Sequence, residues 1–342
     1  MNLEDLDFNL PHELIAQHPI YPRDYSKLMV LNRNTQEISH KKFYEILEFF
    51  KKGDILVLND SKVIKARFYG SNEKTGGKRE IFLLKQIDKF KWKAFASPNK
   101  RVHEGDNILI SKKPLIKVKI EKKEVNEDTL IFETNNLSME EVLKNFGEVP
   151  LPPYIKGKIE DESEYQTIYA SIPGSVASPT AGLHFTEKLI KKLEDKGIII
   201  EYVTLHVGPG TFKPIQEKSI EKHLMHEEDF FISEETAKNI NNAKAKGGKL
   251  YACGTTVIRS LETTSTKEGI LKPIDGKTKL FIKPGYNFKI VDAIITNFHF
   301  PRTTLLALVM SFSGKEFVLS AYSNAIKEKY RFFSFGDAML II

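Results

Sequence analysis

Cysteine is almost absent from this sequence, and that absence excludes several classes of protein. The single cysteine, Cys253, rules out a disulfide framework and a zinc site built on cysteine ligands. Such sparse use of cysteine is typical of a reducing compartment, so we expect a cytoplasmic protein. The apolar runs are too short to span a membrane, and residues 1–7 are acidic, unlike a secretory or transit signal.

The sequence also lacks the glycine-rich signatures of nucleotide-binding proteins. Neither G-x-x-x-x-G-K-[ST] nor G-x-G-x-x-G occurs, and Gly208-Pro-Gly210 is too short and too stiff to replace either. The G-x-S-x-G turn of serine hydrolases is missing as well. His223 and His226 have the i, i+3 spacing of two metal ligands, but we identify no third ligand near them and expect no metal.

The composition is that of a globular protein with a sizeable core. Hydrophobic residues make up 41% and charged residues 28% of the chain, and a length of 342 residues suggests about two domains. The net charge of +6 permits a nucleic-acid partner. It does not require one, because many lysines alternate with apolar residues and can lie on solvated faces.

The middle of the chain has the pattern of a small β domain. Short β-like runs separated by turns lie at 80–85, 91–96, 107–110, 116–120 and 129–133. Strands at this spacing predict a barrel or a sandwich. Ser138 and Glu141 form a capping box that begins a helix running to Phe146. We therefore predict an inserted all-β, barrel-like domain over 65–150.

The flanking segments, 1–64 and 151–342, alternate between helix and strand, which predicts a layered α/β main domain. The predicted helices are 10–18, 43–50, 187–196, 234–246, 256–264, 304–312 and 316–328. The predicted strands are 27–31, 54–58, 198–205, 250–253, 279–282 and 293–297. The expected fold class is thus α/β, with a layered catalytic domain and the barrel-like domain inserted into it.

The stretch 178–186, SPTAGLHFT, combines proline, glycine, hydroxyl groups and a histidine, and it leads directly into a predicted helix. Thr186 is placed to cap that helix, and a helix N-terminus suits an anionic ligand. A structural turn with one hydrogen-bonded histidine is the alternative. Similar polar loops follow predicted strands at 59–62, 206–212, 253–259 and 296–304. Ligands of α/β sheets bind at the carboxyl ends of strands, so these loops together predict one cleft, although each alone could be an ordinary turn.

Seven stretches of the chain resemble a single protein family. They are 7–24, 59–67, 179–186, 203–212, 254–259, 295–301 and 330–337. The family is the S-adenosylmethionine:tRNA ribosyltransferase-isomerases of queuosine biosynthesis, and the resemblance runs from residue 7 to the C-terminus. Lys27 and Lys213 stand where this family usually has arginine, which keeps the charge but loses the bidentate geometry. Pro209 and Cys253 also replace commoner residues.

The resemblance implies an enzyme that transfers and isomerises the ribosyl moiety of S-adenosylmethionine onto 7-aminomethyl-7-deazaguanine at the tRNA wobble position. The products are epoxyqueuosine-tRNA, adenine and methionine. S-adenosylmethionine is then the ribosyl donor, no metal takes part, and the partner is the tRNA anticodon arm. We expect a monomer that does not bind membranes. A non-catalytic RNA-binding protein and a methyltransferase remain alternatives, which product analysis would separate.

The implied chemistry needs a base, an acid for the leaving adenine and a site that excludes water. Histidine is the suitable residue type, and the expected catalytic residues are His184, His206 and His299. The helix start at Gly254 and the Arg259 guanidinium are expected to bind the methionine carboxylate. Phe185, Phe212 and Phe298 are candidates for stacking on the wobble base. The expected substrate-binding residues are Asn59, Asp60, Ser61, Thr180, Gly182, Phe185, Thr186, Gly208, Gly210, Thr211, Phe212, Gly254, Thr255, Thr256, Arg259 and Asn297.

Overall fold

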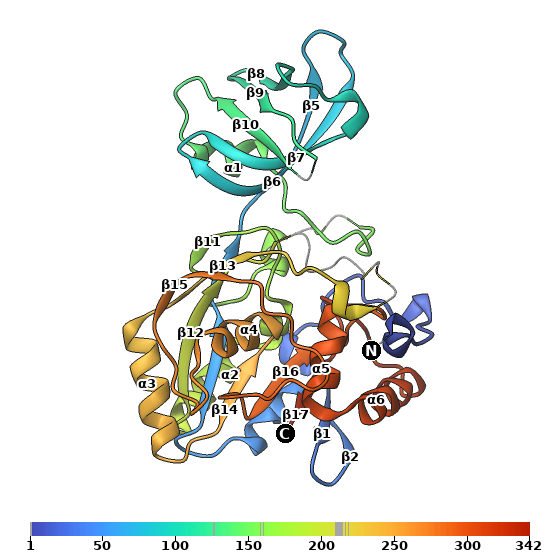
Figure 1. Ribbon diagram of the computed structural model, residues 1–342, viewed down its shortest axis with the longest axis vertical. Coiled ribbons are helices and arrows are strands. Elements are labelled where there is room, and N and C mark those ends of the chain that lie inside the picture. The colour runs from blue at the N-terminus through green and yellow to red at the C-terminus, as the bar shows by residue number, and fades with distance from the viewer. Residues whose placement is uncertain are drawn as a thin grey trace. The chain divides into compact units, whose positions relative to one another are not determined.

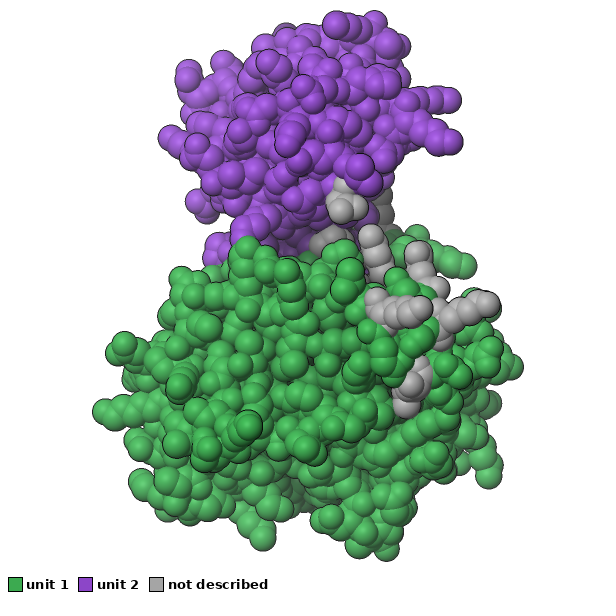
Figure 2. All heavy atoms as spheres, in the orientation of Figure 1, with its two compact units in different colours: residues 1–62, 153–172, 178–342 green, residues 63–152, 173–177 purple. Residues whose placement is uncertain are grey.

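The computed structural model describes residues 2–125, 127–157, 159, 161–208, 215, 217 and 219–342, and the chain divides into two compact units. The first unit comprises residues 1–62, 153–172 and 178–342, and the second comprises residues 63–152 and 173–177 (Figure 2). The domain prediction placed the inserted part at 65–150. In the structure, residues 173–177 also belong to the second unit, because Val176 is buried in the hydrophobic core of that unit.

A mixed β-sheet forms the centre of the first unit (Figure 1). Its strands, in spatial order, are β15 (Ile274–Thr278), β13 (Glu228–Ile232), β12 (Ile199–Leu205), β3 (Ile55–Asn59), β14 (Leu250–Cys253), β16 (Ala293–Asn297), β17 (Ala338–Ile341), β1 (Lys27–Asn32) and β2 (Glu37–Lys42). Strands β12, β3, β14 and β16 run parallel, so their carboxyl ends meet at one edge. Strand β17 is antiparallel to β16, and its first residue, Ala338, therefore lies opposite Asn297 at that edge.

Helices cover both faces of this sheet, which is why β3, β14 and β16 are buried along their whole length. On one face, η4 (Phe43–Phe49), η7 (Thr180–His184) and α2 (Glu187–Asp195) pack against alternate residues of the strands. On the other face, α4 (Thr255–Thr264) packs against β3, β12 and β14 (Figure 1). The layered α/β architecture predicted from the sequence is confirmed.

The remaining α-helices of the first unit are α3 (Glu234–Ala245), α5 (Thr304–Ser313) and α6 (Lys315–Lys327), close to their predicted ranges. Thr186 caps α2 as predicted, because its hydroxyl accepts the backbone N–H of Leu189 at 3.2 Å. Across the described ranges, no single helix is long and apolar enough to cross a membrane. Helices α5 and α6 pass that test only as a pair, and the chain bends by 114° between them.

The local predictions were wrong at three places. Residues 10–18 and 43–50 form 3₁₀ turns, η2 (His12–Leu14) and η4, instead of α-helices. The strand predicted at 279–282 lies earlier, at β15, which pairs with β13 along its full length. The chain leaves the sheet after β15, and Ile282 is buried outside any strand. Burial of this apolar residue outside the sheet therefore imitated a strand pattern in the sequence.

The second unit is a closed antiparallel barrel, as predicted. Its strands follow the order β10 (Asp128–Glu133), β7 (Lys91–Ser97), β6 (Lys78–Asp88), β5 (Arg67–Asn72), β8 (Asn107–Lys112) and β9 (Leu115–Lys122). Alternate residues such as Trp92 and Ala94 fill the interior, and α1 (Met139–Phe146) adds Met139 and Val142 to this core. The predicted capping box is present, with Ser138 and Glu141 each accepting the other's backbone N–H.

Short elements complete the chain. They are η1 (Leu3–Leu6), η3 (Arg23–Tyr25), η5 (Asn99–Arg101), η6 (Glu162–Tyr165), η9 (Ile220–Lys222), and the paired strands β4 (Ser61–Val63) and β11 (Ile172–Ser175). Of these, η3 leads into β1 at the edge where the parallel strands end.

Candidate active site

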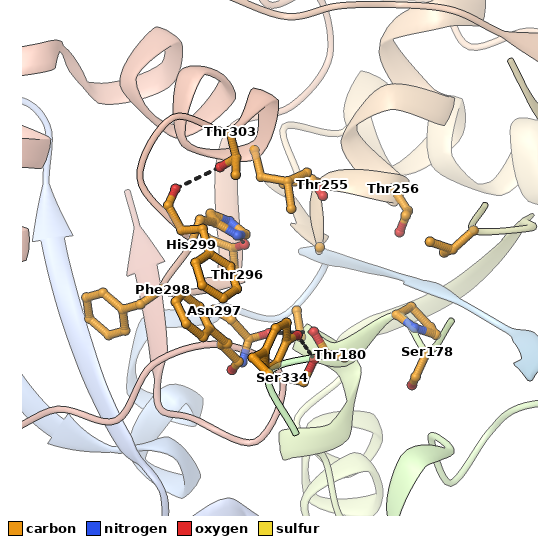
Figure 3. A pocket seen from close by; sticks show the side chains of 18 residues that line it. Ser178, Thr180, Thr255, Thr256, Thr296, Asn297, Phe298, His299, Thr303 and Ser334 are labelled. Carbon is orange, nitrogen blue, oxygen red and sulfur yellow. Dashed lines mark hydrogen bonds between the residues drawn. The ribbon is translucent and has the colours of Figure 1, made fainter. Parts of the chain in front are cut away.

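A cavity lies within the first unit, at the edge where the parallel strands end (Figure 3). Its wall is formed by η7 and the residues before it, the first turn of α4, the end of β16, the start of α5 and the segment before β17. In Figure 3 the threonines of α4 and Thr303 lie above the cavity, and Ser178, Thr180 and Ser334 lie below it. Segments far apart in the sequence therefore converge on one space.

The turn from β14 into α4 supplies one side of this cavity. Gly254 has a φ of +91°, a left-handed conformation that side chains rarely adopt, and this lets the chain turn sharply into the helix. The helix has no side-chain cap at this end. Thr255 and Thr256 line the cavity, so the first turn of α4 brings uncapped N–H groups and a partial positive charge to it.

Ser178 brings a buried hydroxyl group to the cavity wall. Its Oγ has no hydrogen-bond partner among the residues that the structure describes. A buried hydroxyl without a partner costs free energy, and such groups are rare in folded proteins. A polar ligand in the cavity would supply the missing hydrogen bond, which favours a binding role for this wall.

Asn297, the last residue of β16, connects three segments at the cavity. Its Oδ1 accepts a hydrogen bond from the Thr180 hydroxyl at 3.2 Å. Its Nδ2 lies 3.1 Å from Nε2 of His184 and donates to the Phe333 carbonyl at 3.2 Å. These partners fix which side of the amide is the donor, so Asn297 is held in one orientation beside the cavity.

His184 lies behind Asn297 and does not line this cavity. Because its Nε2 accepts from the Asn297 amide, the ring proton belongs on Nδ1, which donates to Ser26 Oγ at 2.8 Å. The imidazole stacks on Phe43, with ring centroids 4.9 Å apart. Both ring nitrogens are therefore hydrogen-bonded within the protein.

The surroundings of His184 keep it neutral. Burial, together with the positive charges of Arg23 and Arg331, lowers the pKa of His184 to about 3. The two arginines and the histidine line a smaller pocket beside the main cavity, and Ser334 lines both. A neutral imidazole bonded at both nitrogens suits the positioning of Asn297 better than proton transfer to a ligand.

His299 is the histidine that lines the main cavity. Its Nε2 lies 2.9 Å from Thr296 Oγ1, and its backbone N–H donates to the Tyr322 hydroxyl at 3.0 Å. Burial lowers the pKa of His299 to about 3 and raises the pKa of Tyr154, on the same wall, to about 12. At neutral pH both side chains are therefore uncharged, and the same shifts make His299 a weaker base and Tyr154 a weaker acid than the free side chains.

His206 does not line the main cavity, although the next residue, Val207, does. It follows β12, is half-buried, and its backbone N–H donates to the Asp229 carbonyl at 3.0 Å. The N–H of Gly208 donates to Oε1 of Glu228 at 3.0 Å. The expected site residues Gly210, Thr211 and Phe212, together with Pro209 and Lys213, lie outside the described residues.

Arg259 is buried in α4 and forms an ion pair with Glu228 through Nη1. Its Nε donates to the Leu280 carbonyl at 3.0 Å, whereas its Nη2 has no hydrogen-bond partner in the described part of the chain. Arg259 lines a small pocket with Thr255 and Thr256, which also line the main cavity. One guanidinium donor therefore remains for a ligand beside the N-terminus of α4.

The whole chain can be compared with known proteins. A family model described as "Queuosine biosynthesis protein" matches residues 3–341. The chain belongs to this family. It is 48% identical over 342 residues to the S-adenosylmethionine:tRNA ribosyltransferase-isomerase of Halothermothrix orenii, and 49% identical over 341 residues to that of Acetivibrio thermocellus, with 100% of each chain covered.

A solved structure extends the similarity to three dimensions. The crystal structure of S-adenosylmethionine tRNA ribosyltransferase from Thermotoga maritima is 37% identical in sequence and superposes with a TM-score of 0.57. The similarity covers 99% of this chain and 100% of the other. Family membership therefore rests on the whole chain and not on the cavity alone.

Some stretches that resemble the queuosine biosynthesis family hold the sheet edge together without lining the cavity. Asn59 bonds both the N–H and the carbonyl of Leu205, at 3.1 and 3.0 Å, and so joins β3 to β12. Asp60 accepts hydrogen bonds from the hydroxyls of Thr204 and Ser171, at 2.6 and 2.9 Å. Ser61 is fully buried and lies outside the cavity wall.

The family's 179–186 stretch divides between the cavity and the core. Thr180 lines the cavity. Phe185 instead packs in the core, where its ring centroid lies 5.0 Å from that of Phe43. Thr186 caps α2, and its hydroxyl also donates a hydrogen bond to the Asp24 carboxylate at 3.0 Å. A Cβ on Gly182 would lie 2.0 Å from the Tyr169 hydroxyl. Glycine is therefore needed here for close packing.

The aromatic wall of the cavity differs from the one expected. The Phe298 ring packs in the core against Phe332, with ring centroids 5.0 Å apart, and points away from the other labelled side chains in Figure 3. Phe298 is nevertheless one of the residues that line the cavity, together with Tyr154, Phe300 and Phe333, and the rings of Phe300 and Phe333 are stacked. Phe300 and Phe333 lie in stretches that resemble the family, 295–301 and 330–337, whereas Tyr154 had no signal in the sequence and reaches the cavity through tertiary contacts.

Two further observations concern Lys27, which stands where the family usually has arginine, and a possible metal site. Lys27 donates to the carbonyls of Glu328 and Lys329, at 2.7 and 3.3 Å, where it complements the C-terminal end of α6 and not a ligand anion. Within the described ranges, no group of three or more histidine, cysteine, aspartate or glutamate residues could hold a metal ion.

Proposed function

We propose that this protein transfers and isomerises the ribosyl moiety of S-adenosylmethionine onto 7-aminomethyl-7-deazaguanine at the tRNA wobble position. The products are epoxyqueuosine-tRNA, adenine and methionine. The observation that carries this proposal is the full-length identity of 47–49% to relatives named S-adenosylmethionine:tRNA ribosyltransferase-isomerase. The cavity at the carboxyl ends of the parallel strands supports it, because substrates of α/β sheets bind at this edge.

The cavity and the small pocket beside it contain groups suited to several parts of S-adenosylmethionine. The first turn of α4 and Nη2 of Arg259 are placed to bind the carboxylate of its methionine part. The Ser178 hydroxyl can bond a polar atom of the ribose or adenine. The stacked rings of Phe300 and Phe333 form an apolar wall that limits access of water to the reacting carbon atoms.

The chemistry assigns roles to the two titratable groups of the wall. The sulfonium acidifies the adjacent C5′–H, and His299 accepts that proton while adenine leaves. Tyr154, which keeps its proton at neutral pH, is the candidate acid for adenine. Loss of the proton and of adenine leaves an unsaturated sulfonium, to which the amine of the tRNA aminomethyl group adds and gives up a proton. A sugar oxygen then closes the epoxide as the carbon–sulfur bond breaks and methionine leaves. His184 acts through Asn297 as a positioning residue.

The test is product analysis with S-adenosylmethionine and tRNA that carries the 7-aminomethyl-7-deazaguanine base. We expect adenine and methionine in equal amounts and epoxyqueuosine in the RNA. S-adenosylhomocysteine and a methylated RNA would instead identify a methyltransferase. RNA binding without any small-molecule product would identify a non-catalytic RNA-binding protein.

Variants of the histidines separate their roles. His299→Asn keeps a polar side chain but cannot act as a base, and we expect it to lose adenine release by about 100-fold or more. His184→Asn should retain measurable turnover, because His184 does not line the main cavity and reaches it only through Asn297. Equal losses in both variants would contradict this division of roles.

The proposal includes three finer expectations. The anticodon arm is the part of the tRNA that is bound, since the wobble base lies in it. The enzyme acts as a monomer, which light scattering of the protein alone would check. A tRNA substrate also agrees with the cytoplasmic location expected from the single cysteine.

A further inference from the structure

Three tyrosines near the start of the chain are unusually exposed. The exposed fractions are 63% for Tyr21, 52% for Tyr25 and 39% for Tyr44. The guanidinium of Arg23 lies over the Tyr21 ring, 5.5 Å from its centroid, and the rings of Tyr25 and Tyr44 are 5.1 Å apart. We call these four residues the tyrosine–arginine patch. Its large rings are only partly buried within the first unit, and such a cluster of exposed aromatic side chains indicates a partner.

The tyrosine–arginine patch lies at the rim of the candidate active site. Arg23 and Tyr25 belong to η3, which leads into β1 at the cavity edge of the sheet. Arg23 also lines the small pocket that includes Ser334, and Ser334 lines the main cavity as well. The patch is thus connected to the cavity through Arg23, whose pocket shares Ser334 with the cavity wall.

The charge of Arg23 is not neutralised by a close carboxylate. Its Nη2 donates to the Glu164 carbonyl at 2.6 Å, and no carboxylate within the described ranges lies inside ion-pair distance of it. The hydrogen bonds from Ser163 lower the pKa of Asp161, and the charge of Arg23 adds a smaller effect in the same direction. Arg331 adds a second positive charge at the pocket and lies 3.9 Å from Asp337.

We propose that the tyrosine–arginine patch binds the nucleotides next to the wobble base, with Tyr21 and Tyr25 stacking on bases and Arg23 contacting a phosphate. This inference rests on the proposed function. Single-stranded RNA is recognised by exposed aromatic rings combined with arginine, and the anticodon loop is single-stranded. A wobble nucleotide inserted into the cavity must have its neighbours at the rim, where this patch lies.

The test is the binding of a fluorescent RNA anticodon stem-loop, followed by anisotropy. Tyr21→Ala and Tyr25→Ala should each weaken binding by about 5- to 150-fold, the range found when a stacked aromatic is removed. Arg23→Gln should reduce the slope of log affinity against log salt by about 0.7, the value for one contact with a single-stranded phosphate. Equal thermal unfolding of variants and wild type would show that the fold is kept.

Matched controls lie elsewhere on the same unit. Phe231→Ala removes a ring that is 47% exposed on β13. Lys51→Gln removes an exposed charge shortly before β3 begins, at the end of the parallel strands opposite to the cavity. Neither should change stem-loop affinity. If these controls weaken binding as much as the patch variants do, the patch has no special role and the inference is overturned.

The readouts also separate this inference from the proposed function. If the wild type releases adenine but Tyr21→Ala binds the stem-loop normally, the function stands and the patch is refuted. If the stem-loop binds through Tyr21 but no adenine is released, the patch stands and the function fails. If Arg23→Gln raises the KM for S-adenosylmethionine and leaves RNA affinity unchanged, Arg23 serves the small substrate, which overturns the phosphate contact.

Discussion

Acid should destabilise the first unit through its two buried histidines. The pKa values of His184 and His299 are lowered from 6.5 to about 3 in the folded protein, chiefly by burial. Below pH 6.5 the unfolded chain binds a proton at each histidine that the folded chain does not bind. Their contribution to stability is therefore complete above pH 6.5 and is lost progressively as the pH falls towards 3.

The size of this effect follows from the two pKa values. Between pH 7 and pH 5, each histidine should reduce the free energy of unfolding by about 2 kcal/mol. The pKa values of both histidines in the folded protein lie well below pH 5. The decrease in the free energy of unfolding over this pH range is therefore set by the pKa of histidine in the unfolded chain. His184→Asn removes one of the two titrating histidines. Between pH 7 and pH 5, the free energy of unfolding of this variant should therefore decrease by about 2 kcal/mol less than that of the wild type.

The assay is urea unfolding at pH 7 and pH 5, followed by circular dichroism. The single tryptophan, Trp92, lies in the barrel, and its fluorescence would report the other unit. His12→Asn is the matched control, because His12 is exposed in the first unit and should leave the wild-type pH dependence unchanged. An equal loss of stability in His184→Asn and the wild type would refute the reasoning.

Three further predictions follow from single contacts. Asn297→Ala removes the link between Thr180 and His184 and should lower kcat for adenine release by about 100-fold, whereas an unchanged kcat would exclude a role for that link. Glu228→Gln weakens the buried ion pair with Arg259 and should lower the free energy of unfolding by about 3 kcal/mol, as measured by urea unfolding. Adding EDTA should leave the rate of adenine release unchanged, and a fall that zinc or magnesium restores would reveal a metal that the proposed chemistry does not include.

Local signals in the sequence were enough to predict much of the fold. The alternation of apolar residues in 91–96 and 116–120 predicted the barrel strands, since a closed barrel buries every second side chain. Thr186 and Ser138 predicted helix starts because a capping hydroxyl bonds an amide only three residues away. Such features depend only on residues close together in the sequence and can therefore be predicted from the sequence.

Several elements had no such signal. Strand β17 went unpredicted because it is a short buried segment whose identity depends on its partners β1 and β16. Strand β15 is polar and exposed along much of its length, and only its pairing with β13 makes it a strand. The 3₁₀ form of η4 likewise went unpredicted, since the apolar spacing of 43–50 matches an α-helix equally well.

The roles of the site residues were decided by tertiary structure. The sequence by itself determined that histidines, glycines and hydroxyl residues occur in loops after strands, and that one family shares them. It could not determine that His184 bonds Ser26 and Asn297, which lie 158 and 113 residues away, or that His299 alone of the three lines the main cavity. The physical reason is that burial and hydrogen-bond partners set the pKa and orientation of an imidazole, and both come from segments that meet only when the sheet is assembled.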